Sequence, residues 1–336
     1  MIGTRTPFRI SFAGGGSDLR SFYSRHPGIV LSTTINKYMY IFVHQFFDNK
    51  IQVKYSQTEL VENIHQIKHP IVREALKKFN LNGIDINSIA DIPAGTGLGS
   101  SCSFTVGLLH ALYAYVSKYS SKDKLAQEAC EIEIDILKEP IGKQDQYAAA
   151  YGGLNLITFY ENEDVNVEPV IMNPENYRKL QENLLLFYIG GVRSTRTILS
   201  DQSNSIINNK KVDQNLVKMT EYAKILKASL ENGQVQDMGY ILQESWKLKK
   251  SLNKKISDSK IDHYYEIARK NGALGGKLLG AGGAGFMLFF CDKDNQDKLR
   301  KSLCNLRETK FKFDRFGTKI IYVDENTNGG HYDIGN

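Results

Sequence analysis

The sequence contains a glycine loop, IPAGTGLGSSCSF, between a strand-like segment and a strongly helical one. Within its core, residues 93–101, the glycines Gly95, Gly97 and Gly99 recur at every second position. Small residues before a helix let backbone N–H groups surround an anion, and the helix N-terminus adds the positive end of its dipole. The pattern therefore predicts a strand–loop–helix unit that holds phosphate, with a plain tight turn as the alternative.

Two common nucleotide motifs are excluded by the spacing of this loop. The Walker A pattern requires a lysine that the loop lacks. Alternating glycines do not match the dinucleotide pattern GxGxxG, and neither of the other glycine loops, at 14–16 and 275–285, is followed by a convincing acid about 20 residues later. A dinucleotide oxidoreductase is therefore disfavoured. The Ser101 hydroxyl is instead placed to contact magnesium, as a P-loop serine or threonine does.

Composition is that of a globular protein that can bury a full core. The residues are 41% hydrophobic and 24% charged. A length of 336 residues is enough for two ordinary domains. A net charge of +6 suits anionic small molecules and is weaker than the dense basic surface of a nucleic-acid binder. The four cysteines are scattered without CxxC spacing, so neither a disulfide framework nor a zinc site is predicted.

Nothing in the sequence resembles a targeting or membrane segment. No apolar run approaches the ~20 residues that cross a bilayer. The first residues lack the continuous apolar stretch of a signal peptide. We therefore expect a cytoplasmic protein with no membrane and no nucleic-acid partner.

Hydrophobic patterning predicts an α+β protein of two domains, 1–180 and 181–336, divided within the polar stretch 161–183. Strands are predicted from residue 7, in a hairpin over 28–56, and at 83–92, 154–160, 183–191, 284–291 and 319–324. Helices are predicted at 70–79, 100–118, 121–138, 143–150, 194–208, 212–232, 235–255, 260–271 and 293–306.

Two acidic residues beyond the loop are candidates for chemistry. Glu133 shares a largely apolar helical stripe with Ala126, Cys130 and Leu137. A carboxylate there is costly unless it is paired or metal-bound, and the alternative is an edge position that reaches solvent. Asp145 lies in the first turn of a predicted helix, where an acid that only complements the helix dipole is the alternative.

The segment from Pro93 to Ser101 resembles the signature Pro-x3-Gly-Leu-Gly-Ser-Ser of the GHMP kinases, which include galactokinase and mevalonate kinase. The resemblance implies a two-domain α+β fold, with an N-terminal domain like ribosomal protein S5 domain 2 and a ferredoxin-like C-terminal domain. It also implies a loop that wraps the ATP phosphates, with Ser101 helping to hold Mg²⁺. The ATP-binding residues implied are Pro93, Gly95, Thr96, Gly97, Leu98, Gly99, Ser100 and Ser101.

The same resemblance assigns the two acids. Members of the family carry a glutamate, a Pro-x-Gly element and an aspartate in a short helix that ends in Gly-Gly. Here Glu133, Pro140, Gly142, Asp145 and Gly152-Gly153 keep that order. The resemblance implies that Glu133 is a magnesium ligand and that Asp145 is the catalytic base.

The first glycine loop resembles the motif that holds the acceptor in sugar-kinase members. Arg9 matches an arginine beside the base and the transferred phosphoryl, and Asp18 matches an aspartate that binds sugar hydroxyls. Gly15 and Gly16 replace the Glu-His pair of galactokinase, which argues against galactose and leaves room for a different or larger sugar. Ser17 completes the implied acceptor set in this loop.

The third glycine loop resembles the family's C-terminal motif, so Gly282 and Gly283 are expected to line the site, with a tight turn as the alternative. Lys277 before it either contacts a phosphate or faces solvent. Arg193 and Arg196 are candidates to clamp an acceptor phosphate, because guanidinium groups suit phosphate. Surface arginines at a helix start are the alternative, and the lysines of 247–255 are interpreted as a solvated helix face.

RTPFRISFAGGGSD and GGVRSTRTILSDQ resemble most the members that phosphorylate the anomeric hydroxyl of D-glycero-D-manno-heptose 7-phosphate. That activity would give the 1,7-bisphosphate for nucleotide-activated heptose and for capsule or lipopolysaccharide. ATP and Mg²⁺ are the implied cofactors, and a monomer or homodimer is expected. Two alternatives stay open: a fucokinase- or galactokinase-like enzyme, and a catalytically silent sugar and ATP sensor.

Overall fold

The protein is described by a computed structural model that covers residues 1–191 and 195–324. Its first elements are β1 (Ile2–Ala13), α1 (Arg20–Tyr23), β2 (Gly28–Gln45), β3 (Ile51–Lys54), β4 (Thr58–Val61), the 3₁₀ turn η1 (Ile64–Gln66), α2 (Pro70–Phe79), β5 (Ile84–Ala90), α3 (Ser100–Tyr115), α4 (Lys122–Cys130), the π-helical turn η2 (Glu131–Ile136), α5 (Gln144–Tyr151), β6 (Leu154–Phe159), β7 (Val165–Pro169), α6 (Pro174–Glu182) and β8 (Leu184–Gly190).

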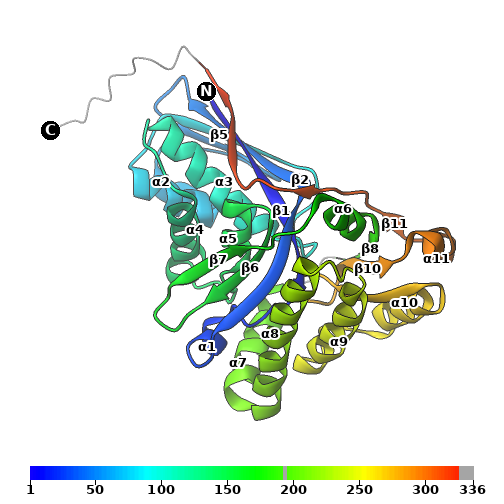
Figure 1. Ribbon diagram of the computed structural model, residues 1–336. Helices are drawn as coiled ribbons and strands as arrows, with labels where there is room; N and C mark the ends of the chain where they lie inside the picture. The colour runs from blue at the N-terminus through cyan, green and yellow to red at the C-terminus, as the bar shows by residue number, and fades with distance from the viewer. Residues whose placement is uncertain (192–194, 325–336) are drawn as a thin grey trace.

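The remaining elements are α7 (Thr195–Asn208), α8 (Lys210–Glu231), α9 (Asp237–Leu252), α10 (Ser259–Lys270), β9 (Ala273–Leu278), β10 (Gly285–Cys291), the 3₁₀ turn η3 (Lys293–Asn295), α11 (Gln296–Ser302), β11 (Arg307–Glu308), β12 (Phe313–Asp314) and β13 (Lys319–Val323). Strands and helices are mixed along the chain, and the strands form two sheets (Figure 1). This arrangement confirms the α+β class. Among the described residues, no helix combines the length and the apolarity needed to cross a bilayer.

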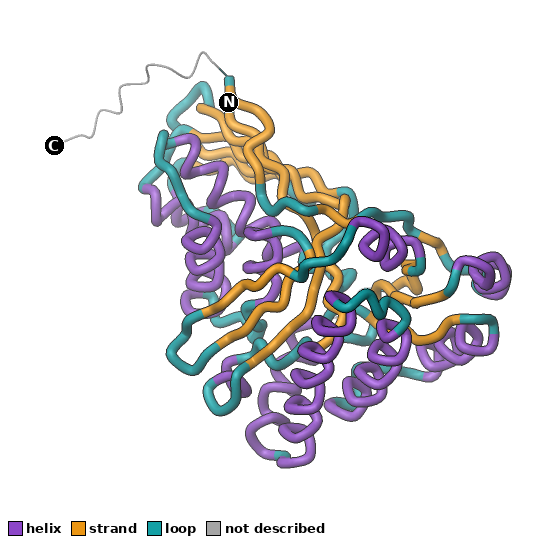
Figure 2. Tube along the Cα trace, in the orientation of Figure 1, coloured by secondary structure: helices purple, strands orange, loops and turns teal. Residues whose placement is uncertain are grey.

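The larger sheet has nine strands within the described chain and is organised around β2. Its main order is β13-β1-β2-β5-β3-β4, and β6, β7 and β12 also belong to it. The long strand β2 pairs antiparallel with β1, β5, β6 and β12 along different parts of its length. Helix α3 packs on β1 and β2, and α2 to α5 gather on one side of this sheet (Figure 2). The loop that precedes α3 is thereby brought to β1.

The predicted hairpin over 28–56 is wrong. Its two strands exist as β2 and β3, but β5 lies between them, antiparallel to β2 and parallel to β3. The partner that forms a hairpin with β3 is β4. A strand–turn–strand pattern predicts extended segments, whereas pairing depends on which later segment buries its apolar face beside them.

The smaller sheet, in the order β11-β8-β10-β9, is buried on both faces. Alternate residues of β8 belong to different cores: Leu184 and Leu186 join the core of the larger sheet, while Leu185 and Phe187 join the core beneath α9 and α10. Burial on both faces explains why this strand reads as a continuous apolar run in the sequence.

The last strands return to the larger sheet. β13 pairs with β1, and β12 pairs with β2. The polar stretch 161–183 contains β7 and α6 and is therefore structured in large part. The division of the chain into domains 1–180 and 181–336 stays a prediction.

Candidate active site

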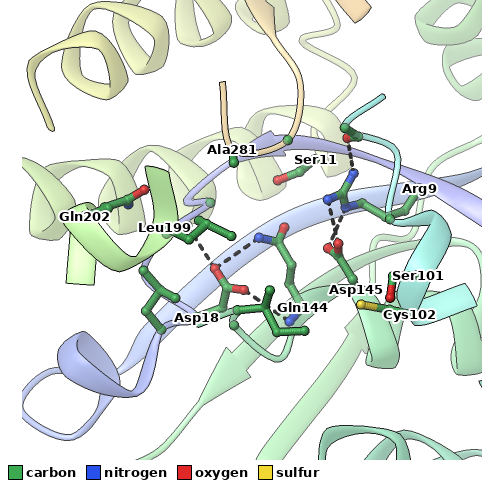
Figure 3. Close-up of a pocket in the computed structure, with 18 of the residues that line it drawn as sticks. Arg9, Ser11, Asp18, Ser101, Cys102, Gln144, Asp145, Leu199, Gln202 and Ala281 are labelled. Carbon is green, nitrogen blue, oxygen red and sulfur yellow. Dashed lines mark hydrogen bonds and ion pairs between the residues drawn. The ribbon is translucent and has the colours of Figure 1, made fainter. Parts of the chain in front are cut away.

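A cavity forms where the end of β1 meets segments from the three glycine loops. Gly15 and Gly16 come from the first loop, Gly95, Gly97 and Gly99 from the second, and Gly280 and Ala281 from the third. Charged side chains from β1, η2, α5 and α9 also line it. Figure 3 shows part of this arrangement, with Arg9, Asp18 and Asp145 reaching into the same space.

The second glycine loop has a backbone that only glycine adopts easily. Gly95, Gly97 and Gly99 have φ angles of +76°, +87° and +77°, in the left-handed region. This conformation explains the alternation of glycines in the sequence. A Cβ on Gly97 would also lie 2.7 Å from the Leu279 carbonyl oxygen, so the second loop packs closely against the third.

The predicted ATP-binding residues divide into two groups. Five line the cavity: Gly95, Gly97, Gly99, Ser100 and Ser101. The other three, Pro93, Thr96 and Leu98, are not among the lining residues. The Thr96 hydroxyl donates to the Pro93 carbonyl at 3.0 Å, and the Leu98 carbonyl accepts from the Arg9 amide at 3.0 Å. These contacts hold the loop in shape rather than facing a ligand.

Glu133 is buried beside Ser101. The predicted helix 121–138 changes at residue 131 into the π-helical turn η2, which carries Glu133 with only 1% of its surface exposed. Ser101 Oγ donates to Glu133 Oε1 at 2.9 Å, and Gln146 Nε2 donates to Oε2 at 2.9 Å. The alternative of a solvent-facing Glu133 is therefore wrong. Burial raises the pKa of this carboxyl to about 7, although the two hydrogen bonds act in the opposite direction.

The Ser101–Glu133 pair fits a magnesium ion that a nucleotide would bring. Both side chains offer oxygen atoms at the wall of the cavity, and oxygen is the donor that Mg²⁺ prefers. The described residues contain no group of three or more His, Cys, Asp or Glu side chains arranged to hold a metal alone. Mg²⁺ is commonly held by one or two carboxylates together with substrate phosphates, so this sparse donor set is suitable.

Arg9 and Asp145, which both line the cavity, form a bidentate ion pair (Figure 3). Arg9 Nε donates to Asp145 Oδ1 at 2.7 Å, and Nη2 donates to Oδ2 at 2.8 Å. Nη1 donates to the Gly97 carbonyl at 2.6 Å. Because a carboxylate has about four lone-pair positions, Asp145 can still accept a hydrogen bond from a ligand hydroxyl.

Asp18 is held beneath the first glycine loop. Its Oδ1 accepts from the Gly16 amide at 2.9 Å and from Gln144 Nε2 at 3.0 Å, and its Oδ2 accepts from the Gln144 amide at 3.3 Å. A Cβ on Gly142 would lie 2.0 Å from Asp18 Oδ2, so this glycine is required. Burial, followed by the nearby Asp145, raises the pKa of Asp18.

The remaining predicted acceptor residues are placed differently from one another. Gly15 and Gly16 line the cavity, whereas Ser17 is fully buried and donates to the Gly14 and Ile29 carbonyls inside the turn. Gly282 and Gly283 are not among the lining residues. A Cβ on Gly282 would meet the Ile256 backbone at 2.8 Å, and the Gly283 amide donates to the Ile256 carbonyl at 2.9 Å.

Of the two arginines predicted to clamp a phosphate, only Arg196 is described, and it does not line the cavity. Arg193 lies outside the described residues. Arg196 is exposed over 63% of its side chain, and its guanidinium lies 3.7 Å from the Glu139 carboxylate. It borders a separate shallow hollow with Lys138 and Pro140.

Four cavity residues were missed or misjudged from the sequence. Ser11 Oγ and Gln144 Oε1 are buried without a hydrogen-bond partner among the described residues. Ser11 could have been found, because it lies two residues from Arg9 on a strand and therefore shares its face. The sequence alone predicts that Lys277 contacts phosphate or faces solvent, and that Lys249 belongs to a solvated face. Both are buried, so the two solvent-facing interpretations are wrong.

Lys249 has a perturbed ammonium group. It follows Leu242 and Trp246 on the buried stripe of α9, and only 7% of its surface is exposed. Burial, followed by the nearby Arg9, lowers its pKa from 10.5 to about 7, while Asp18 acts in the opposite direction. Burial, followed by the nearby Lys249 and Arg9, lowers the pKa of Lys277.

The lowered pKa of Lys249 predicts how the stability of the unliganded protein depends on pH. Between about 7 and 10.5 the unfolded chain binds this proton more tightly than the folded protein, so the free energy of unfolding rises with pH. Lys249→Gln removes this contribution. Urea unfolding at about pH 6, 7.5 and 9 should show wild type gaining stability relative to the variant as pH rises. A difference that is constant with pH would contradict the assignment.

Comparison with known proteins identifies the family. The model of the GHMP kinases N terminal domain matches residues 65–153, and the model of the GHMP kinases C terminal domain matches residues 217–308. The first match includes the second glycine loop, Glu133 and Asp145, and the second includes Lys249 and the third glycine loop.

Individual relatives agree with these matches. The D-glycero-alpha-D-manno-heptose 7-phosphate kinase of Campylobacter jejuni is 29% identical over 90% of this chain and 93% of its own. The bifunctional fucokinase/GDP-fucose pyrophosphorylase of Arabidopsis thaliana is 24% identical over 88% of this chain, which spans 30% of that longer protein. The crystal structure of a D-glycero-D-manno-heptose 1-phosphate kinase from Bacteroides thetaiotaomicron superimposes with a TM-score of 0.79 at 25% identity, over 96% of this chain and 100% of that one. The chain therefore belongs to the GHMP kinases, with their two-domain fold, and is an ATP-dependent phosphotransferase.

Proposed function

We propose that this kinase transfers the γ-phosphoryl group of ATP to the anomeric hydroxyl of D-glycero-D-manno-heptose 7-phosphate, giving the 1,7-bisphosphate. The observation that carries the proposal is the Arg9–Asp145 ion pair beside the Ser101–Glu133 pair in one cavity. Two proteins similar to this chain, from Campylobacter jejuni and Bacteroides thetaiotaomicron, are named as heptose phosphate kinases, which supports the choice of acceptor.

The proposed reaction is an in-line phosphoryl transfer. The anomeric oxygen forms a bond to the γ-phosphorus while the bond from that phosphorus to the β–γ bridging oxygen breaks, and ADP leaves. Asp145 accepts or orients the proton of the attacking hydroxyl. Arg9 holds Asp145 through two hydrogen bonds and places positive charge where the phosphoryl group passes. The N-terminus of α3 and the amides of the second glycine loop receive the phosphates.

Ser101 and Glu133 would hold Mg²⁺ together with the phosphates. When bound, the ion neutralises charge on the β- and γ-phosphates. Gln146 holds the Glu133 carboxylate through Oε2, so the other oxygen, which Ser101 contacts, is oriented toward the cavity wall. A metal ion favours the ionised form of this carboxyl and so offsets the cost of its burial.

The acceptor side offers several polar groups to the hydroxyls of a sugar. Asp18, positioned by the Gly16 amide and by Gln144, is the expected partner of ring hydroxyls. The unpartnered Ser11 Oγ and Gln144 Oε1 offer further hydrogen bonds to such hydroxyls. Gly15 lies between them, since a Cβ on it would be 3.3 Å from Ser11 Oγ and 3.7 Å from Gln144 Nε2.

The product would serve the synthesis of nucleotide-activated heptose for capsule or lipopolysaccharide. We expect the protein in the cytoplasm, where ATP is available, as a monomer or homodimer. A fucokinase-like or galactokinase-like activity is the competing proposal, and a silent sensor would bind ATP and sugar without forming product.

An acceptor panel tests the proposed substrate. ADP release, coupled to a spectrophotometric reaction, should be fastest with D-glycero-D-manno-heptose 7-phosphate and much slower with the unphosphorylated heptose, fucose and galactose. Phosphorus NMR of the product should show a new phosphate on the anomeric carbon. Activity confined to fucose or galactose would replace the proposal, and binding of ATP and sugar with no product would favour the sensor.

Replacement of Asp145 tests the base. Asp145→Asn should lower kcat by about 10²- to 10⁴-fold, because the amide cannot accept the hydroxyl proton. Asp297→Asn is the matched control, since Asp297 also lies in the first turn of a helix but is 89% exposed. Similar small effects in both variants, with folding verified by circular dichroism, would reduce Asp145 to an acid that complements the helix dipole.

Replacement of Glu133 tests the proposed metal ligand. Glu133→Gln should raise the Mg²⁺ concentration that gives half-maximal rate by at least about tenfold. Glu131→Gln, in the same π-helical turn but 53% exposed and paired with Lys78, should behave as wild type. Calorimetric titration of an ATP analogue with and without Mg²⁺ provides a readout that does not depend on turnover. An unchanged Mg²⁺ requirement in Glu133→Gln would reject this role.

A further inference from the structure

We infer that the two buried lysines of the cavity, Lys249 and Lys277, bind the phosphate that the acceptor already carries. This inference rests on the proposed function, because it names the residues that would recognise a phosphorylated rather than a free sugar. Arg196, which was expected to share in such a clamp, does not line the cavity, and Arg193 lies outside the described residues.

The two lysines enter the cavity from the C-terminal half of the chain. Lys249 lies on α9, and Lys277 lies on β9 just before the third glycine loop. They are exposed over only 7% and 2% of their surfaces, yet both line the cavity. Lys277 Nζ donates to the Phe12 carbonyl of β1 at 3.0 Å. Phe12 directly follows Ser11, whose hydroxyl has no partner among the described residues.

Among the described residues, neither lysine forms an ion pair with a carboxylate, and Asp18 acts on Lys249 only without direct contact. Lys249 Nζ donates to the Leu278 carbonyl at 3.1 Å and to the Gly280 carbonyl, whereas Lys277 is described with a single carbonyl partner. An ammonium has three N–H donors, so donors remain on both groups. A buried cation without a counter-charge is costly. An anion in the cavity would supply that counter-charge, and it would restore the protonated form of Lys249.

The neighbouring guanidinium is already engaged. Arg9 uses Nε and Nη2 on Asp145 and Nη1 on the Gly97 carbonyl. Of the three cations that line the cavity in the described part of the chain, the two lysines therefore have the most unused hydrogen-bonding capacity. Arg196, by contrast, is exposed and lies 3.7 Å from Glu139.

Two phosphoryl groups could supply this chemistry: the acceptor's own phosphate and the group transferred from ATP. The Lys277 contact to Phe12 places that ammonium at the end of β1, which leads into the first glycine loop and Asp18. This position favours the acceptor's phosphate. Lys249 contacts Gly280, which packs against Gly97 of the second loop, so the experiment must separate the two sources.

The experiment compares Lys249→Gln and Lys277→Gln with wild type. Glutamine removes the charge but keeps an N–H donor for the carbonyls, so loop anchoring and charge recognition are separated. Lys247→Gln is the control, because Lys247 is on the same helix, is 56% exposed and pairs with Glu244. Calorimetry measures Kd for heptose 7-phosphate and for an ATP analogue, and steady-state kinetics measures kcat/KM for heptose 7-phosphate and for the unphosphorylated heptose.

Loss of one charge-assisted hydrogen bond should raise Kd for heptose 7-phosphate about ten- to a hundredfold in each variant. Binding of the ATP analogue and kcat/KM for the unphosphorylated heptose should stay within about threefold of wild type. The ratio of kcat/KM for heptose 7-phosphate to kcat/KM for the unphosphorylated heptose should therefore fall in both variants. Lys247→Gln should keep the wild-type ratio.

Three results would overturn the inference. Equal losses of kcat with both sugars would assign the lysines to the transferred phosphoryl. Variants with an unchanged preference and unchanged affinity would leave them only a structural role. A wild-type enzyme that prefers the unphosphorylated sugar would reject the proposed function itself, whereas failure of the variants alone, with wild type active on the 7-phosphate, would reject only the lysine assignment.

Discussion

The Arg9 guanidinium joins three segments that are far apart in the sequence. It extends from β1, binds both oxygens of Asp145 at the start of α5, and reaches the Gly97 carbonyl of the second glycine loop. Because all three bonds come from one planar group, the guanidinium itself sets the distance between Asp145 and the second glycine loop. β1 can hold this position because it is paired with β2 over nearly its whole length and covered by α3.

Around this pair the cavity contains an unusual amount of buried charge. Burial raises the pKa of Glu133 to about 7 and lowers the pKa of Lys249 to about 7. It also raises the pKa of Asp18. Such groups destabilise an empty site and are stabilised by ligands of opposite charge. Mg²⁺ at Glu133 and phosphate at the lysines would each offset one of these costs. If these residues have the proposed roles, the same burial that lowers stability would serve activity.

Part of the candidate site could be predicted because some of its residues follow local rules, whereas the roles of Glu133 and Asp145 rest on the family resemblance. The glycine alternation of the second loop reflects three left-handed residues, and Glu133 was singled out as an acid on an apolar stripe. The same stripe argument applied to Lys249 would have found it beside Trp246, but a dense run of lysines suggested a solvated face. Ser11 could have been found from its alternation with Arg9, since both lie on one face of β1.

By itself, the sequence determined most of the helices, the longer strands, the glycine loops and the family, because each of these depends on neighbouring residues and on a local motif. Short strands such as β4, β9 and β12, and the elements β7 and α6 within the polar stretch, were not predicted. Only the tertiary structure decided that β5 separates β2 from β3, that Ser17 is enclosed in its turn, and that Lys277 lies in the cavity. These outcomes depend on contacts between residues distant in the chain, where strand pairing and burial compete across the whole molecule. No local pattern contains that information.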